Sequence, residues 1–176
     1  MPLDLPPLPD YLRPGLRLLF VGYNPGETSA RLGHYYAFQH NFFWPALHAS
    51  RLVPEPLTFL DDHRLPEFGI GITDLAKRPS RAASDIPASE FHAGREALRS
   101  KICSVHPLVV AFNGKGVYEK FTGKPCKLGL QTETVCGARV FVLPSTSPRY
   151  AFISREEKLR WFRRLKQLLD RLSKTL

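Results

Sequence analysis

Four stretches of glycines and polar residues hold the side chains best suited to chemistry, and each follows a short apolar run. The apolar runs are rich in β-branched or aromatic residues, which is typical of buried strands. In an open parallel sheet, ligands bind beyond the carboxyl ends of the strands. The four stretches are therefore expected to converge on one cleft, and they comprise residues 22–29, 73–80, 113–116 and 144–149.

Two side chains in these stretches are able to act on a water molecule. Asp74 directly follows the second apolar run, where a carboxylate is able to activate water or to stabilise positive charge that grows on a substrate. The alternative for Asp74 is an N-cap at a strand-to-helix turn. Asn24 stands beside a proline between two glycines, and its amide orients water but is a poor base. The alternative for Asn24 is an asparagine that stabilises a tight turn.

The glycines and histidines do not form a known cofactor or metal motif. Gly22 and Gly26 let the backbone approach a ligand closely, but the stretch does not read G-x-G-x-x-G. The lysine of Gly123-Lys124-Pro125 lacks the following Ser or Thr of a phosphate-binding P-loop. The 6 histidines show no ligand spacing. We therefore expect neither a metal nor a cofactor.

Strands and helices alternate along the chain. Strands are predicted at 16–21, 69–73, 108–112 and 140–143, and helices at 41–50, 89–102, 115–121 and 155–173. Residues 128–135 are a further candidate strand that turns at Gly137 into a hairpin. This order predicts an α/β fold of three layers, α/β/α, around a mostly parallel sheet of four to five strands. We expect a single domain over residues 1–176, with residues 1–14 as a flexible arm.

The charge balance favours a polyanionic partner. The 176 residues include 25 Lys or Arg against 16 Asp or Glu, a net charge of +9, which attracts nucleic acid. Solvated lysines and arginines, including those on the last helix, are the alternative. No apolar run approaches the roughly 18 residues that cross a bilayer, so no membrane partner is expected. The 3 cysteines form no C-x-x-C pair, which favours free thiols in a reducing compartment.

Several ordered blocks resemble the mismatch-specific uracil/thymine-DNA glycosylases of the uracil-DNA glycosylase superfamily. The resemblance spans residues 16–169, and its first motif is G-Y-N-P-G at 22–26, continuing through G-H-Y-Y at 33–36 and N-F-F-W at 41–44. The middle blocks are D-D-H-R-L-P at 61–66, G-I-G-I-T-D at 69–74 and F-N-G-K-G at 112–116. The second motif is L-P-S-T-S-P-R-Y-A at 143–151. The resemblance implies a uracil-DNA glycosylase-like fold and removal of a base from DNA.

The resemblance assigns roles around the flipped base. Removing a base requires extruding its nucleotide from the duplex. Tyr36 would stack on that base, and the backbone of Gly22 and Tyr23 would read its edge. Ser29 and Ser80 would line the pocket, with turn formation as their alternative. Asn24 would hold the attacking water, while Asp74 departs from the asparagine or lysine more common at its position. Which of the two activates the water stays open.

The same resemblance implies a DNA-binding surface. Ser145 and Ser147 would grip phosphates, and Arg149 would enter the duplex to fill the space that the flipped base leaves. Such phosphate contacts position DNA without reading its sequence. Lys77, together with Arg78 and Arg81, would add phosphate contacts, with a solvated basic loop as the alternative.

These observations predict a monofunctional DNA glycosylase that hydrolyses the N-glycosidic bond of uracil, and of thymine or other damaged bases, in mismatched duplexes. The partner is double-stranded DNA with a G:U or G:T mismatch or a damaged base, and the protein is expected to be a monomer. It would lie with the nucleoid in a bacterium or in the nucleus of a eukaryote. The alternatives are a nucleoside or nucleotide hydrolase and a non-catalytic nucleic-acid-binding module.

Overall fold

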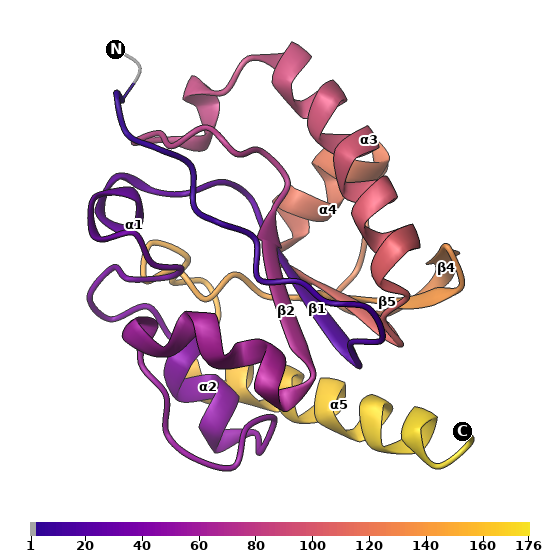
Figure 1. The fold of residues 1–176 in the computed structure, drawn as a ribbon. Coiled ribbons are helices and arrows are strands. Elements are labelled where there is room, and N and C mark those ends of the chain that lie inside the picture. Colours follow the sequence, from indigo (N-terminus) through magenta and orange to yellow (C-terminus); the bar gives the residue numbers. More distant parts are fainter. Residues whose placement is uncertain (1–2) are drawn as a thin grey trace.

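A computed structural model describes residues 3–176, and a five-stranded sheet lies at the centre of that part of the chain (Figure 1). The strands are β1 (Leu18–Gly22), β2 (Ile70–Asp74), β3 (Val109–Asn113), β4 (Gly129–Val135) and β5 (Ala138–Leu143). Their order is β2-β1-β3-β5-β4. β4 pairs antiparallel with β5, and all the other pairs are parallel. The mostly parallel sheet and its hairpin confirm the predicted α/β class.

The helices cover both faces of the sheet. They are α1 (Glu27–Leu32), α2 (Phe43–Ala49), α3 (Ala88–Val105), α4 (Lys115–Thr122) and α5 (Arg155–Ser173), with two 3-10 helices, η1 (Phe59–Phe68) and η2 (Ala83–Asp85). α5 has the bounds that the sequence predicts, since its apolar residues recur over five turns. The 6-residue α1 was not predicted, because so short a helix shows no periodicity.

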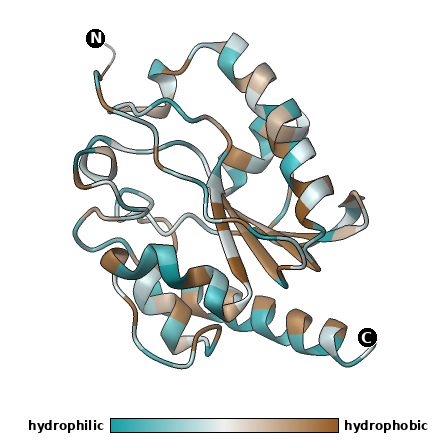
Figure 2. Cartoon of the chain, viewed as in Figure 1, coloured by the Kyte–Doolittle hydropathy of each residue, from teal (hydrophilic) through white to brown (hydrophobic). Residues whose placement is uncertain are grey.

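Alternate residues of the strands supply two hydrophobic cores. Leu18 and Phe20 of β1 pack with α2, η1 and α5 on one face, while Leu19 and Val21 pack with α3 and α4 on the other. Figure 1 shows these helices on opposite sides of the sheet, and Figure 2 shows mainly hydrophobic strands between them. The period of two along a strand with both faces buried therefore produces the three-layer architecture.

The expectation of a flexible N-terminal arm is wrong for residues 3–14; Met1 and Pro2 lie outside the described residues. The segment runs beside β2 (Figure 1), and Tyr11 forms an antiparallel bridge with Ile72 through two backbone hydrogen bonds of 3.2 and 3.1 Å. The side chain of Leu8 is only 3% exposed. The exposed edge of β2 offers unpaired backbone groups, so a short extended segment binds there without any periodicity that sequence reasoning could detect.

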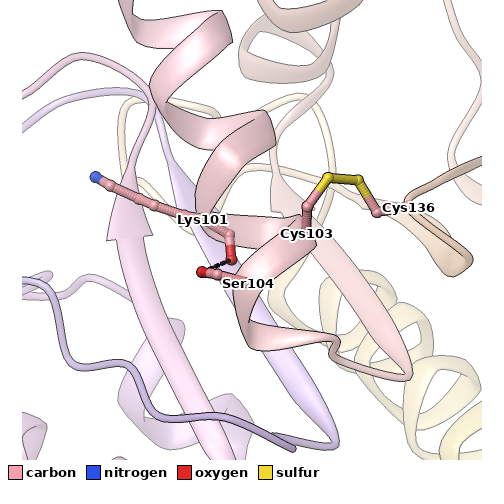
Figure 3. Close-up of a disulfide and its surroundings, with 4 residues drawn as sticks. All are labelled: Lys101, Cys103, Ser104 and Cys136. Carbon is pink, nitrogen blue, oxygen red and sulfur yellow. Dashed lines mark hydrogen bonds between the residues drawn. A yellow bond between two sulfur atoms is a disulfide. The ribbon is translucent and has the colours of Figure 1, made fainter.

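The expectation that all cysteines are free thiols is also wrong. Cys103 of α3 and Cys136, in the turn between β4 and β5, form a disulfide (Figure 3). The packing of α3 beside this hairpin brings the two Cα atoms to 5.2 Å, within the range that a disulfide spans. Cys126 is free.

The registers of the strands place their carboxyl ends at one edge. Gly22 of β1 pairs with Asp74 of β2, and Asn113 of β3 pairs with Leu143 of β5. The polar stretches that follow these strands therefore begin side by side. Among the helices within residues 3–176, none is both long and apolar enough to cross a membrane.

Candidate active site

A cavity of about 370 Å³ opens at this edge of the sheet. Its wall includes residues from each of the strand ends just described, together with the segment that follows α1. Cavities of this size accommodate small ligands. The predicted site residues that line it are Gly22, Tyr23, Asn24, Ser29, Tyr36, Asp74, Ser145, Ser147 and Arg149.

Asp74 lines this cavity, and its side chain is buried. The residue is 4% exposed, and its Oδ2 atom is buried with no hydrogen-bond partner among residues 3–176. No helix begins next to it, because the following helical residues are those of η2 and α3. The N-cap alternative for Asp74 is therefore excluded. A buried carboxylate oxygen without a partner is costly and rare, which is typical of functional sites.

The surroundings of Asp74 make it a base suited to neutral pH. Burial raises the pKa of this carboxyl to about 7; the positive charge of Lys77 opposes the rise, the negative charge of Asp10 adds to it, and the positive charge of Lys101 opposes it. A general base is most effective when its pKa lies near the working pH. The carboxylate form is therefore present at and above neutrality and is lost below it.

Gly22 keeps space open between Asp74 and Tyr36. A Cβ at Gly22 would lie 2.5 Å from Asp74 Oδ1 and 2.8 Å from the Tyr36 hydroxyl. Glycine is therefore the residue that lets both polar groups lie over the end of β1. Burial, and then the charge of Asp74, raise the pKa of the Tyr36 hydroxyl, which consequently stays protonated at neutral pH.

Tyr36 is one of the aromatic residues that line the cavity. The ring packs on Phe43 with centroids 4.3 Å apart, and the residue adopts a positive φ of 51°. A non-glycine residue with positive φ is uncommon and signals a position that its surroundings enforce. The buried hydroxyl oxygen has no hydrogen-bond partner among residues 3–176. Tyr36 thus offers a ring for stacking and a hydroxyl near Asp74.

Asn24 joins two loops and leaves one atom free for the cavity. Its Nδ2 donates to the backbone oxygen of Arg78 at 2.9 Å and to Ser80 Oγ at 2.7 Å. These bonds fix the orientation of the amide. The Oδ1 atom is then the one that remains to accept a hydrogen bond from a water, so the turn-stabilising role and the water-orienting role are compatible.

The other residues predicted to contact the flipped nucleobase differ in their positions and hydrogen bonds. Ser29 lines the cavity, and its buried Oγ accepts from the backbone N–H of Ala37 at 3.1 Å. Ser80 does not line the cavity; it accepts from Asn24 and donates to the backbone oxygen of Ala82 at 2.7 Å. The carbonyl groups of Gly22 and Tyr23 each accept one hydrogen bond, from the backbone N–H groups of Leu75 and Ala76, and each oxygen keeps a second lone pair.

The second motif forms a loop that contains two half-buried serine hydroxyls. Ser145 Oγ accepts from the backbone N–H of Ser147 at 3.3 Å, and Ser147 Oγ accepts from that of Arg149 at 3.2 Å. Each hydroxyl proton is therefore left to donate. Asn113 fixes the start of this loop through two hydrogen bonds with the buried Thr146, at 2.9 and 3.1 Å.

A buried lysine forms two hydrogen bonds with the backbone of the same loop. Lys158 of α5 is 4% exposed, and its Nζ donates to the backbone oxygens of Ser147 at 3.3 Å and Tyr150 at 2.8 Å. Arg149 is exposed on the loop, and Phe152, three residues on, is 90% exposed. A loop that is held by these hydrogen bonds and carries an exposed cation and an exposed ring suits insertion into stacked bases.

Lys77 is not placed for the phosphate contact expected from the sequence. Its Nζ pairs with Asp10 Oδ1 at 2.7 Å and lies 3.3 Å from the Tyr35 hydroxyl. Arg81 pairs with Glu27 at 2.8 Å, and both residues line the mouth of the cavity. Sequence reasoning missed the ion pairs because their partners are 67 and 54 residues apart along the chain.

Sequence reasoning also missed Leu8, Asn113 and Lys158 as parts of the site. Leu8 lines the cavity from the N-terminal segment, and nothing in its sequence neighbourhood indicates this. Asn113 was placed in a cleft loop but received no role. Within residues 3–176, no group of three or more His, Cys, Asp or Glu side chains is arranged to hold a metal ion.

Comparisons with known proteins agree on one family. The model of the uracil DNA glycosylase superfamily matches residues 9–170. A Schizosaccharomyces pombe protein described as a G/U mismatch-specific uracil DNA glycosylase is 38% identical over 162 residues, which cover 86% of this chain. The match covers 50% of the S. pombe protein, so the chain spans about half the length of this relative.

A solved structure has the same fold. The solution NMR structure of a candidate uracil DNA glycosylase from Methanosarcina acetivorans superposes with a TM-score of 0.63 and 23% sequence identity. The similarity covers 92% of this chain and 98% of the other. At this identity the likeness establishes the architecture of the sheet and its helices.

Proposed function

Because the chain belongs to the uracil DNA glycosylase superfamily, we propose that it is a DNA repair glycosylase that removes uracil from G:U mismatches. The observation that carries this proposal is the buried, unpartnered carboxylate of Asp74, whose pKa burial raises to about 7, in a cavity beside an aromatic ring. The cavity suits a flipped pyrimidine, and the carboxylate suits activation of water at neutral pH.

The proposed reaction is hydrolysis of the N-glycosidic bond. Tyr36 stacks on the extruded uracil, and Asn24 Oδ1 accepts a hydrogen bond from the attacking water. The water oxygen forms a bond to C1′ of the deoxyribose while the bond from C1′ to N1 breaks, and its electron pair leaves with the uracil. Asp74 takes the proton of the water. Its negative charge also stabilises the positive charge that develops on the sugar.

The surface around the cavity mouth supports a duplex rather than a free nucleoside as the substrate. The hydroxyls of Ser145 and Ser147 keep their protons available for phosphate oxygens. Arg149 and Phe152 project from the same loop. A small substrate would need no such surface, whereas a flipped nucleotide leaves a gap that a side chain has to fill. Thymine in G:T mismatches is a second proposed substrate of the same pocket.

Duplexes with U:G, T:G and U:A pairs, and a single strand with uracil, test the proposed function. The protein is incubated with each, and alkali-labile abasic sites are measured by strand cleavage. We expect the highest single-turnover rate on U:G. Cleavage of free deoxyuridine without action on any duplex would support a nucleoside hydrolase instead. Binding of duplexes without base release would support a non-catalytic binding module.

Arg149→Ala is expected to impair cleavage of duplex DNA more than cleavage of single-stranded DNA. The reason is that a residue which fills the space of the flipped base is needed only where a stack exists. The ratio of the two single-turnover rates measures this effect. Ser147→Ala serves as the comparison, because loss of a phosphate contact should weaken binding of both substrates. Equal losses for Arg149→Ala on both substrates would make Arg149 a phosphate contact only.

A further inference from the structure

The N-terminal segment brings the carboxylate of Asp10 next to Thr73, at the end of β2 that carries Asp74. Leu8 reaches the cavity wall, the backbone oxygen of Pro9 accepts from the Tyr35 hydroxyl at 2.9 Å, and Tyr11 pairs with β2. Asp10, between these anchors, turns its side chain toward the end of β2. The segment is therefore held on both sides of Asp10, and its carboxylate has a defined position.

Asp10 binds two lysines from different elements. Its Oδ1 atom pairs with Lys77 at 2.7 Å, and its Oδ2 atom pairs with Lys101 of α3 at 2.6 Å. Thr73, the neighbour of Asp74 in β2, donates its hydroxyl to Asp10 Oδ1 at 2.7 Å. Figure 3 shows Lys101 leaving α3 on the side away from Cys103. Asp10 thus gathers both ammonium groups beside the strand end that carries Asp74.

The hydrogen bonds keep Asp10 ionised. Burial by itself would raise the pKa of the Asp10 carboxyl, but the bonds from Lys101, Lys77 and Thr73 outweigh burial and lower it. With Asp74 ionised, the two lysines and the two carboxylates are electrically balanced. Among the described residues, neither lysine forms an ion pair with Asp74. The positive charges are therefore near Asp74 but bound to another carboxylate.

We propose that Asp10 is a positioning residue: it holds Lys77 and Lys101 away from direct contact with Asp74, so that Asp74 keeps the basicity that the activation of water requires. This inference rests on the proposed function. Lys77 and Lys101 are the two cations whose charges act on Asp74, so without the charge of Asp10 their effect on that carboxylate is no longer balanced. A cation in direct contact stabilises the carboxylate form and makes it a weaker base.

All the charged groups around Asp74 enter this balance. Lys77 lowers the pKa of Asp74, Asp10 raises it and Lys101 lowers it, after the larger effect of burial. The other titratable or charged groups that face it or line its cavity are Tyr23, Tyr35, Tyr36, Glu27, Arg81 and Arg149. Glu27, at the cavity mouth, forms ion pairs with both Arg81 and Arg31. The cations whose charges act on the pKa of Asp74 are Lys77 and Lys101, and Asp10 binds both.

Two substitutions should move the same titration in opposite directions. The acid limb is the low-pH range over which the single-turnover rate falls as Asp74 becomes protonated. In Asp10→Asn, this limb should move to lower pH by about one unit, because two cations lose their counterion. The plateau rate should fall as the base weakens. In Lys101→Met, loss of a cation should move the limb to higher pH. A merely structural role would slow both variants without moving the limb.

The experiment measures the U:G cleavage rate between about pH 5 and about pH 9 for wild type, Asp10→Asn and Lys101→Met. Asp170→Asn is the matched control, since it removes a carboxylate that pairs with Lys166 on the surface of α5. Its limb should coincide with that of wild type. Circular dichroism checks that each variant is folded. If Asp10→Asn does not fold, Asp10→Glu and Lys101→Met carry the test. Asp10→Glu keeps the negative charge and should show the same acid limb as wild type.

A readout without catalysis separates this inference from the proposed function. Carbon-13 NMR of the Asp74 carboxyl against pH should give the same opposite shifts in Asp10→Asn and Lys101→Met. If the titration shifts but no duplex releases uracil, the positioning role stands and the proposed function fails. If uracil is released and neither the limb nor the titration moves in either variant, the positioning role is overturned and the proposed function stands.

Discussion

Asp74→Asn is expected to slow single-turnover release of uracil by about 10²-fold or more, the usual cost of losing a general base or an electrostatic stabiliser. The amide takes the place of the carboxylate with little change in shape. It neither accepts the proton of the water nor stabilises positive charge on the sugar. The rate on a U:G duplex, measured with enzyme in excess, gives the effect.

The pH dependence of wild type gives a sharper form of this prediction. Because burial raises the pKa of Asp74 to about 7, the carboxylate is protonated below that pH and the rate should fall about tenfold per unit. In Asp74→Asn the acid limb should flatten. Asn24→Ala should be slow at every pH and keep the limb, since an amide does not titrate in this range.

The stability of the protein should depend on pH in the direction opposite to its activity. The pKa of Asp74 is raised by burial from 3.8 to about 7, so the folded state binds the proton more tightly than the unfolded state does. The free energy of unfolding therefore decreases as pH rises through that window. At about pH 8, Asp74→Asn should have a higher Tm than wild type, and the difference should vanish near pH 4.

Full activity in Asp74→Asn would contradict the role of Asp74 as the base and would assign the water to Asn24 alone.

Gly22→Ala is expected to abolish most activity while the protein stays folded. The added methyl group would lie 2.5 Å from Asp74 Oδ1 and 2.8 Å from the Tyr36 hydroxyl, well inside van der Waals contact. Either the carboxylate or the ring has to move. A displacement of about 1 Å at a reacting group costs about 10²-fold in rate. Single-turnover rates at a pH above the acid limb measure the loss.

Gly116→Ala, in α4, is the matched control. A Cβ at Gly116 meets only Tyr23 Cε2, at an ordinary contact distance of 3.8 Å, and Gly116 does not line the cavity. This variant should retain the wild-type rate, with the same circular dichroism spectrum as Gly22→Ala. If Gly22→Ala proves as active as Gly116→Ala, the chemistry takes place away from the gap between Asp74 and Tyr36.

The sequence determined the architecture because its signals are local. Apolar runs such as 108–112 are too short for helices and are buried on both sides, and the apolar stripe of 155–173 recurs with helical spacing. Their alternation is sufficient for a parallel sheet between helices. It also places the polar stretches that contain Asn24, Asp74 and Arg149 at one edge, since parallel strands end on the same side.

The tertiary structure alone decided how those residues are partnered. Asp74 could cap a helix or face a cavity, and only the packing around it leaves its carboxylate buried and unpartnered. Lys77 could reach phosphate, but Asp10 binds it from 67 residues away. Cys103 and Cys136 meet because α3 packs beside a hairpin. Ion pairs, disulfides and buried charges depend on distances between segments remote in the chain, which no local pattern of residues encodes.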